Sequence, residues 1–198
     1  MRCVIVLNGE YIDNFDFKKD DFLIACDGAY SKLINKGIVP DEVLGDFDSL
    51  GFVPEGAVVF PVEKDMTDGE LALSRAKDKG FPLVAIICAG GGREDHFIGN
   101  ISLLYKAFDL GMEAELYTRR SIVRYLGEGR HRFSVKKETV VSLFSFGGAF
   151  VTESKGLKYP YRDYHLLPSS TLGISNKAEE DEISFTVKEG GLLFFINN

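Results

Sequence analysis

Short, uninterrupted apolar runs are the feature that most constrains how this chain can fold. Runs without polar alternation are typical of strands that are buried on both faces of a sheet. In the first half of the chain these runs are Val4–Leu7, Phe22–Cys26, Val58–Val62 and Leu83–Cys88. We therefore expect them to form strands that are buried on both faces.

Helix patterns lie between and after these runs. Thr67 and Glu70 have the Thr-x-x-Glu spacing of a capping box, and Gly80 should end the helix that follows. A second helix is predicted over residues 97–110, ended by Gly111. Its apolar stripe consists of Phe97, Ile101, Leu104, Tyr105 and Phe108. Strands that alternate with helices predict a doubly wound, largely parallel sheet.

The pattern changes near Tyr125. Beyond it the chain shows short β-rich runs separated by Gly, Glu-Lys and Pro-containing turns, and no convincing helical period. The runs cover 132–135, 139–146, 149–154, 183–187 and 192–196. We expect an α/β domain over residues 1–125 and an antiparallel β-sandwich over 126–198.

Charge and composition exclude several classes of function. The 198 residues carry a net charge of -7, which disfavours non-specific nucleic-acid binding because that needs clustered Lys and Arg. No apolar stretch approaches the roughly 20 residues that span a bilayer. The N-terminal run is too short for a signal peptide and no cleavage site follows it, so we expect a cytoplasmic protein without membrane partners. Cys3, Cys26 and Cys88 are isolated and should be inert, buried thiols.

Acidic and glycine residues gather where the parallel strands should end. Asp27 and Gly28 follow one run, and Asp46 and Asp48 follow a short Val43-Leu44 run. Asp65 and Asp68 follow the next run, and Gly90–His96 follows the last. Ligands of open parallel sheets sit beyond the carboxyl ends of the strands, so these residues should converge on one crevice.

Carboxylates crowded in this way favour a divalent cation. Like charges repel, and Mg²⁺ prefers hard oxygen ligands such as carboxylates and phosphates. Asp46 and Asp48 are alternate residues that can face one metal from an extended backbone. Each Asp taken singly is better explained as a turn or cap residue, but the gathering of acidic residues at four strand ends favours a metal site.

The Gly90–Gly92 run leads into a helix, where free amide groups and the guanidinium of Arg93 can bind phosphate. His96 and Asn100 share one face of that helix. A P-loop and a Gly-x-Gly-x-x-Gly fingerprint are both absent from the sequence, which disfavours an ordinary P-loop ATPase or a dinucleotide dehydrogenase. In the second half, Tyr159 offers a flat face for a heteroaromatic cation, although spacing alone favours ordinary strand packing there.

These motifs, taken in order, resemble those of the thiamine pyrophosphokinases. They are Cys26-Asp27-Gly28-Ala29, Gly45–Ser49, Lys64–Asp68, Gly91–His96 with Asn100, Gly156–Tyr159 and Ile174–Asn176. The resemblance implies transfer of diphosphate from ATP to the thiamine hydroxyl, with Mg²⁺ as cofactor and AMP as the second product. It implies a nucleotide-binding catalytic first domain, a thiamine-binding sandwich, and a homodimer with active sites at the subunit interface.

The resemblance also implies roles for particular residues. Asp46, Asp48 and Asp68 look like metal ligands and, together with Asp95, like catalytic residues. Nucleotide or phosphate contacts are implied for Asp27, Gly28, Arg93, Asp95 and Asn100, and thiamine contacts for Lys64, Tyr159 and Ser175. Asp68 or Asp95 could accept the hydroxyl proton. Two alternatives remain open at this point: a metal-dependent nucleotide-sugar glycosyltransferase, which can also use an Asp-x-Asp pair, and a non-catalytic sensor of thiamine or nucleotide.

Overall fold

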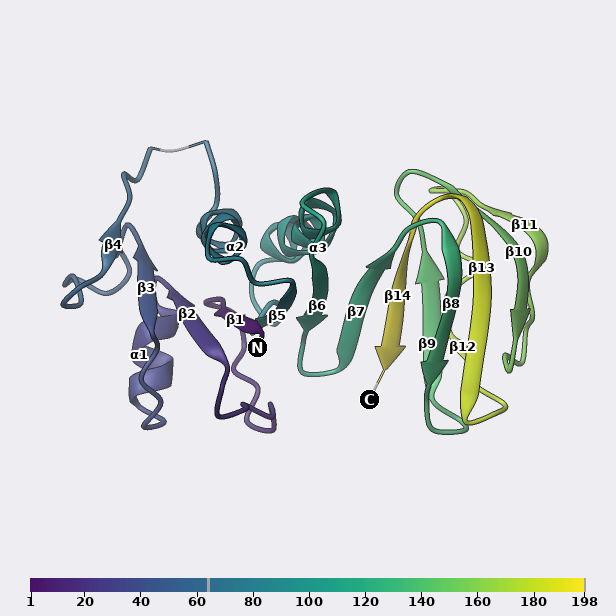
Figure 1. The fold of residues 1–198 in the computed structure, drawn as a ribbon, viewed down its shortest axis with the longest axis horizontal. Coiled ribbons are helices and arrows are strands. Elements are labelled where there is room, and N and C mark those ends of the chain that lie inside the picture. Colours follow the sequence, from purple (N-terminus) through teal and green to yellow (C-terminus); the bar gives the residue numbers. More distant parts are fainter. Residues whose placement is uncertain (64, 198) are drawn as a thin grey trace. The chain divides into compact units, whose positions relative to one another are not determined.

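The computed structural model describes residues 1–63 and 65–197. The chain divides into two compact units, Met1–Arg119 and Arg120–Asn198, and each is described by itself (Figure 1). The first unit is an α/β unit and the second consists of strands alone among the described residues, which confirms the predicted fold class. Within the described residues, no helix is long and apolar enough to cross a membrane.

The first unit is built on a parallel sheet with the strand order β6-β5-β1-β2-β3-β4. The strands are β1 (Cys3–Val6), β2 (Phe22–Cys26), β3 (Glu42–Gly45), β4 (Val58–Val59), β5 (Leu83–Ile87) and β6 (Glu113–Tyr117). The helices are α1 (Ala29–Ile34), α2 (Asp68–Asp78) and α3 (Glu94–Asp109). The chain runs outward from β1 to β4 and then returns to β5 on the other side of β1. The winding therefore reverses at β1, and this is where such sheets bind ligands.

Burial follows the apolar runs in the centre of this sheet but not at its edge. All four residues of β1 are fully buried between β2 and β5. The run from Val58 behaves differently, because only Val58–Val59 forms a strand and Val59 and Val62 are 57% and 69% exposed. The expectation of a strand buried on both faces was wrong here, because β4 occupies the edge of the sheet.

The helices show which local signals determine their ends. Thr67 is the N-cap of α2, and its hydroxyl accepts a hydrogen bond of 3.3 Å from the amide of Glu70. The side chain of Glu70 pairs with Lys106 of α3 instead of closing the reciprocal half of the box. In α3 the stripe buries Ile101 and Leu104 but leaves Phe108 49% exposed, so the predicted apolar face is only partly used.

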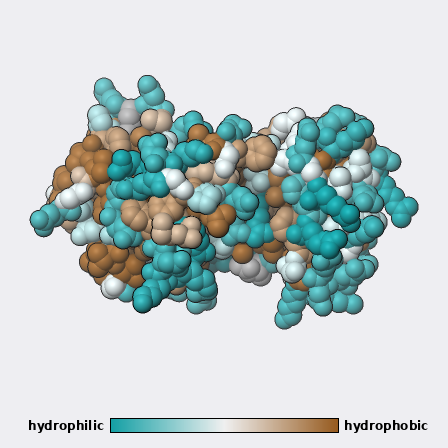
Figure 2. Space-filling model, viewed as in Figure 1, coloured by the Kyte–Doolittle hydropathy of each residue, from teal (hydrophilic) through white to brown (hydrophobic). Residues whose placement is uncertain are grey.

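The second unit contains two antiparallel sheets, with the orders β12-β9-β14-β7 and β11-β10-β13-β8. The strands are β7 (Ser121–Leu126), β8 (Gly129–Ser134), β9 (Val140–Phe144), β10 (Ala149–Lys155), β11 (Arg162–Leu166), β12 (Asn176–Lys177), β13 (Glu182–Gly190) and β14 (Leu192–Asn197). One core joins them, in which the Phe185 and Phe194 rings lie 5.4 Å apart between their centroids. Hydrophilic side chains cover much of this unit on the face seen in Figure 2.

The cysteines are free and buried. Burial raises the pKa of Cys3 to about 12 and also raises the pKa values of Cys26 and Cys88. Because the thiolate is the reactive form, these thiols are protonated and unreactive near neutral pH.

Candidate active site

A cavity of about 460 Å³ lies at the carboxyl ends of β1, β2 and β5, where the winding of the sheet reverses. Polar and charged side chains reach it from four segments of the first unit. They are Asn8, Asp27, Thr67, Asp68, Arg93, Asp95, His96 and Asn100. The structure therefore brings together five of the predicted site residues: Asp27, Asp68, Arg93, Asp95 and Asn100.

An acidic cluster stands where β2 and β3 end. One carboxylate oxygen from each of Asp27, Asp46 and Asp48 lies within 4.8 Å of the others. Asp27 and Phe47 both have left-handed backbone conformations, with φ of 46° and 60°. Phe47 is 3% exposed in the core, so this turn buries the ring and leaves Asp46 and Asp48 on the two sides of it. Such sparsely populated conformations are typical of functional sites.

Gly45 allows the two strand ends to approach each other. Its φ is 153°, and a Cβ atom there would lie 3.1 Å from the Cβ of Asp27. Any larger residue would push Asp27 away from Asp46, because this contact is between main-chain segments with little freedom to move.

The oxygen atoms of the cluster fit a hard divalent cation. Oδ2 of Asp27 accepts a hydrogen bond from the Ser49 hydroxyl at 2.5 Å. Oδ1 of Asp27 is buried and has no hydrogen-bond partner among the described residues. A buried, unpartnered carboxylate oxygen beside two more carboxylates is costly unless a cation binds it. The sequence predicts Asp46, Asp48 and Asp68 as metal ligands. Because Asp27 lies beside Asp46 and Asp48, it is a further candidate ligand.

Asp68 is the first residue of α2, and it lines the same cavity as Asp27. Gly28 lies one residue beyond Asp27 as the N-cap of α1. A Cβ atom at Gly28 would lie 2.5 Å from Nδ2 of Asn8, so the glycine makes room for the Asn8 side chain.

The start of α3 carries the basic group of the cavity. Arg93 precedes the helix, and its guanidinium donates to both carboxylate oxygens of Asp95, at 3.1 and 2.5 Å. The Arg93 ion pair lowers the pKa of Asp95, and Asp95 in turn raises the pKa of Arg93. Asn100 donates from its amide to the carbonyl of Ala89 at 2.9 Å, which ties α3 to the end of β5.

Sequence reasoning gave no role in the site to Asn8, Thr67 or Gly99, which line this cavity, or to Ser49, which contacts Asp27. Asn8 directly follows the apolar run of β1, so the rule that found Asp27 and Asp46 would also have found it. Ser49 stood within a quoted motif, but its contact depends on the turn at Phe47.

In the second unit, two of the predicted thiamine contacts flank Asn176. The buried Asn176 amide accepts from the Tyr159 amide at 3.1 Å and donates to the Tyr159 carbonyl at 2.7 Å. Ser175 has φ of 61° and donates from its amide to the Ser142 hydroxyl. The Tyr159 side chain is 61% exposed. Lys64, the third predicted contact, lies outside the described residues.

Comparisons with known proteins agree across both units. Residues 16–116 match the family model described as thiamin pyrophosphokinase, catalytic domain, and residues 130–192 match thiamin pyrophosphokinase, vitamin B1 binding domain. The chain is 31% identical to a thiamine pyrophosphokinase of Bacillus subtilis over 86% of this chain and 84% of that protein.

Solved structures give the same result. A crystal structure of thiamine pyrophosphokinase from Bacillus subtilis has a TM-score of 0.88 and 27% identity, and covers 100% of this chain and 99% of its own. A second, from Geobacillus thermodenitrificans, has a TM-score of 0.86 and 27% identity, with coverage of 100% and 98%. The Candida albicans enzyme, at 18% identity and a TM-score of 0.78 over 99% and 88% of the two chains, shows the shared fold.

Proposed function

Since the chain belongs to the thiamine pyrophosphokinase family, we propose that its acidic cluster and adjoining cavity bind ATP and Mg²⁺ for the transfer of diphosphate to thiamine. The chain is a thiamine diphosphokinase, an ATP-dependent pyrophosphotransferase. The glycosyltransferase and the non-catalytic sensor are not favoured by any of the family or structural matches.

The observation that carries the proposal is the approach of Asp27, Asp46 and Asp48 to within 4.8 Å, beside a cavity that also contains Asp68. These carboxylates would hold the ion, which supplies neutralisation of the charge on phosphate oxygens. Arg93 and amide groups at the start of α3, which also line the cavity, would bind phosphate oxygens.

The transfer itself needs correct positioning and a proton acceptor. The thiamine hydroxyl oxygen forms a bond to the β-phosphorus of ATP, the bond from that phosphorus to the α,β-bridging oxygen breaks, and AMP leaves. The hydroxyl proton passes to a carboxylate. Asp68 and Asp95 both line the cavity and are the two candidate acceptors.

Thiamine would bind to the second unit through Tyr159 and Ser175, together with Lys64. The exposed Tyr159 ring offers a face to the positively charged thiazolium ring. Lys158 already places its ammonium 5.5 Å from the centroid of that ring, so thiamine would take the opposite face or displace it.

We further propose a cytoplasmic homodimer in which each active site combines the first unit of one subunit with the second unit of the other. The family resemblance supports the dimer. The three buried, free cysteines are consistent with a reducing compartment.

Metal dependence tests the proposed site directly. Purified protein is incubated with ATP and thiamine in Mg²⁺ or in EDTA, and AMP is quantified. We expect thiamine-dependent AMP only in the presence of Mg²⁺. Equal AMP formation in EDTA would remove the metal from the proposal.

A further inference from the structure

Lys32 makes two hydrogen bonds that tie α1 to the wall of the cavity. Its ammonium donates to the carbonyl of Asn8 at 2.8 Å and to the carbonyl of Gly9 at 2.7 Å. Asn8 and Gly9 both line the cavity directly after β1. One ammonium group thus holds two successive carbonyls of the turn toward α1.

The other side of this turn is fixed by the main chain. The amide of Gly9 donates to the carbonyl of Cys88 at 3.0 Å, and the amide of Glu10 donates to that of Gly90 at 2.7 Å. A Cβ atom at Gly9 would lie 2.2 Å from the Cys88 carbonyl oxygen, so the turn packs closely against the end of β5. Lys32 therefore holds the side of the turn that faces α1, through its hydrogen bonds to the two carbonyls.

This arrangement presents the side chain of Asn8 to the cavity. Asn8 is exposed, and its amide has no hydrogen-bond partner in the part of the chain that the structure describes. Its atoms lie directly over Gly28, which restricts where the amide can point. A free side-chain amide at the cavity wall can donate to a phosphate oxygen or a nucleotide hydroxyl, or accept from the latter.

Lys32 also places a positive charge beside the Asn8–Gly9 turn. Among the described residues no carboxylate lies within ion-pair distance of it, and its two partners are neutral carbonyls. A half-buried ammonium without a counter-ion costs desolvation energy. A positive charge beside the cavity attracts an anionic ligand. The Lys32 ammonium would therefore favour the binding of a triphosphate.

We propose that Lys32 is a positioning residue for nucleotide binding, which acts by holding the Asn8–Gly9 turn so that the Asn8 amide contacts the nucleotide. The proposal rests on the proposed function, because it takes the cavity to be the ATP site.

The test compares steady-state kinetics of the wild type with Lys32→Met, Lys32→Arg and Asn8→Ala. Lys36→Met is the matched control, because the ammonium of Lys36 pairs with the exposed Asp13 and lies over the half-buried ring of Tyr11, and Lys36 does not line the cavity. We expect Lys32→Met to raise KM for ATP about tenfold with little change in kcat or in KM for thiamine. Lys32→Arg should restore most of the affinity, because its guanidinium can donate to both carbonyls.

The outcomes separate this proposal from the proposed function. A wild type that forms no thiamine-dependent AMP overturns the function itself. An active wild type with an unchanged KM for ATP in Lys32→Met overturns the positioning role alone, as does an equal rise of KM for both substrates. If Lys32→Met does not fold, Asn8→Ala decides, and an unchanged KM for ATP in that variant also overturns the proposal. In a double variant that combines Lys32→Met with Asn8→Ala, the two increases in KM for ATP should be less than additive. Both substitutions act on the same contact, that of the Asn8 amide with the nucleotide.

Discussion

The hydroxyl of Ser49 donates a hydrogen bond of 2.5 Å to Oδ2 of Asp27, and this contact joins the ends of β3 and β2. It uses one oxygen of the carboxylate and leaves Oδ1 buried without a hydrogen-bond partner among the described residues. Asp27 is therefore held in one orientation, with Asp46 and Asp48 close by. The stability of the folded protein should therefore depend strongly on whether a cation is bound at this cluster.

Asp27→Asn should stabilise the metal-free protein, because it removes one of three crowded negative charges. The gain should be about 1 kcal/mol, the repulsion of two unit charges about 4 Å apart in water. Asn tolerates the left-handed backbone that this position requires. Thermal unfolding in EDTA and in Mg²⁺ measures both effects. The Tm of the wild type should rise with Mg²⁺ and that of the variant should not. An equal rise in both would contradict a role for Asp27 in metal binding.

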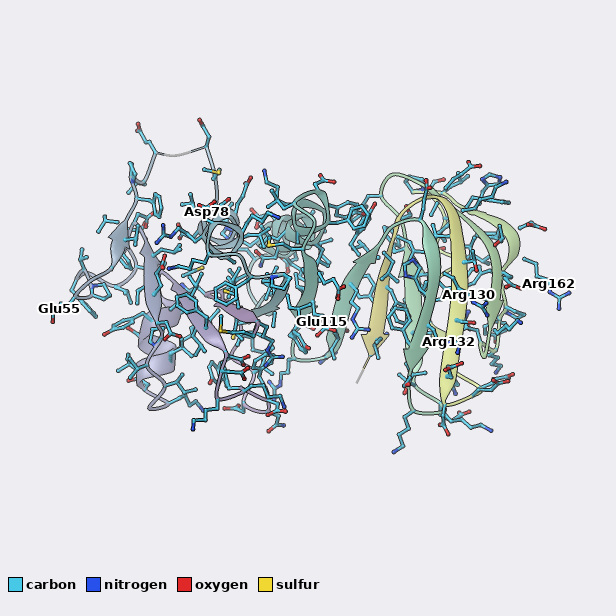
Figure 3. All side chains as sticks on the ribbon, viewed as in Figure 1. Glu55, Asp78, Glu115, Arg130, Arg132 and Arg162 are labelled. Atoms are coloured by element: carbon cyan, nitrogen blue, oxygen red, sulfur yellow. The ribbon has the colours of Figure 1, made fainter. Side chains whose placement is uncertain are left out.

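Asp48→Asn should reduce kcat roughly hundredfold or more without unfolding the chain, because metal binding contributes several kcal/mol to such transfers. Asp48 is exposed, so its loss costs little folding energy. Glu55→Gln is the control, since Figure 3 shows Glu55 on the loop before β4. Near-normal turnover in Asp48→Asn would exclude Asp48 from the metal site.

Arg93→Ala should raise the pKa of Asp95 toward its ordinary value, because the guanidinium hydrogen bonds are the largest cause of its lowering. In the folded wild type, the interaction stabilises the protein above the unfolded pKa of Asp95 and is lost as pH falls through the lowered folded pKa. NMR titration of the side-chain carboxyl carbon follows this directly. An unchanged Asp95 titration in the variant would show that the ion pair does not form in solution.

Asn176→Ala should destabilise the protein by about 1–3 kcal/mol, because it leaves the main-chain groups of Tyr159 without their partner. It should also raise KM for thiamine, since the Tyr159 segment loses its support. Urea unfolding and kinetics measure the two effects. Lys177→Met is the control, because the ammonium of Lys177 pairs with the exposed Glu138. Equal stability of the Asn176 variant and the control would contradict the structural role of Asn176.

Mixing two inactive variants tests the shared active site. In Asp48→Asn the first unit is defective, and in Tyr159→Ala the second. If each site combines units from two subunits, half of a randomly mixed population is hybrid and each hybrid has one intact site. Activity should then recover to about a quarter of the wild-type value. No recovery above the average of the two variants would place both units of a site in one subunit.

Much of the fold follows from local patterns in the sequence. The apolar runs at Val4 and Phe22 and the capping box at Thr67 predict elements that the structure contains. Helix α1 gave no such signal, because it has six residues and its N-cap, Gly28, makes no side-chain cap. The exposure of Val59 was not predictable, since the position of β4 at the edge depends on the whole sheet.

Part of the candidate site could also be predicted from local patterns in the sequence. Residues at strand ends converge because the sheet is parallel, and Asp27 and Asp68 were found in this way. The inclusion of Asp27 in the acidic cluster depends on the left-handed turns at Asp27 and Phe47, which no spacing rule specifies. The contact of Lys32 with Asn8 joins segments far apart in the sequence and makes no local pattern.

Transfer of an intact diphosphate from ATP to thiamine is tested most directly by analysing the products of one reaction. Purified protein is incubated with ATP, Mg²⁺ and thiamine, and nucleotides and thiamine phosphates are separated and quantified. AMP and thiamine diphosphate should form in equal amounts, and neither should form when thiamine is omitted. ADP formed together with thiamine monophosphate, or ATP consumption that is independent of thiamine, would contradict the transfer.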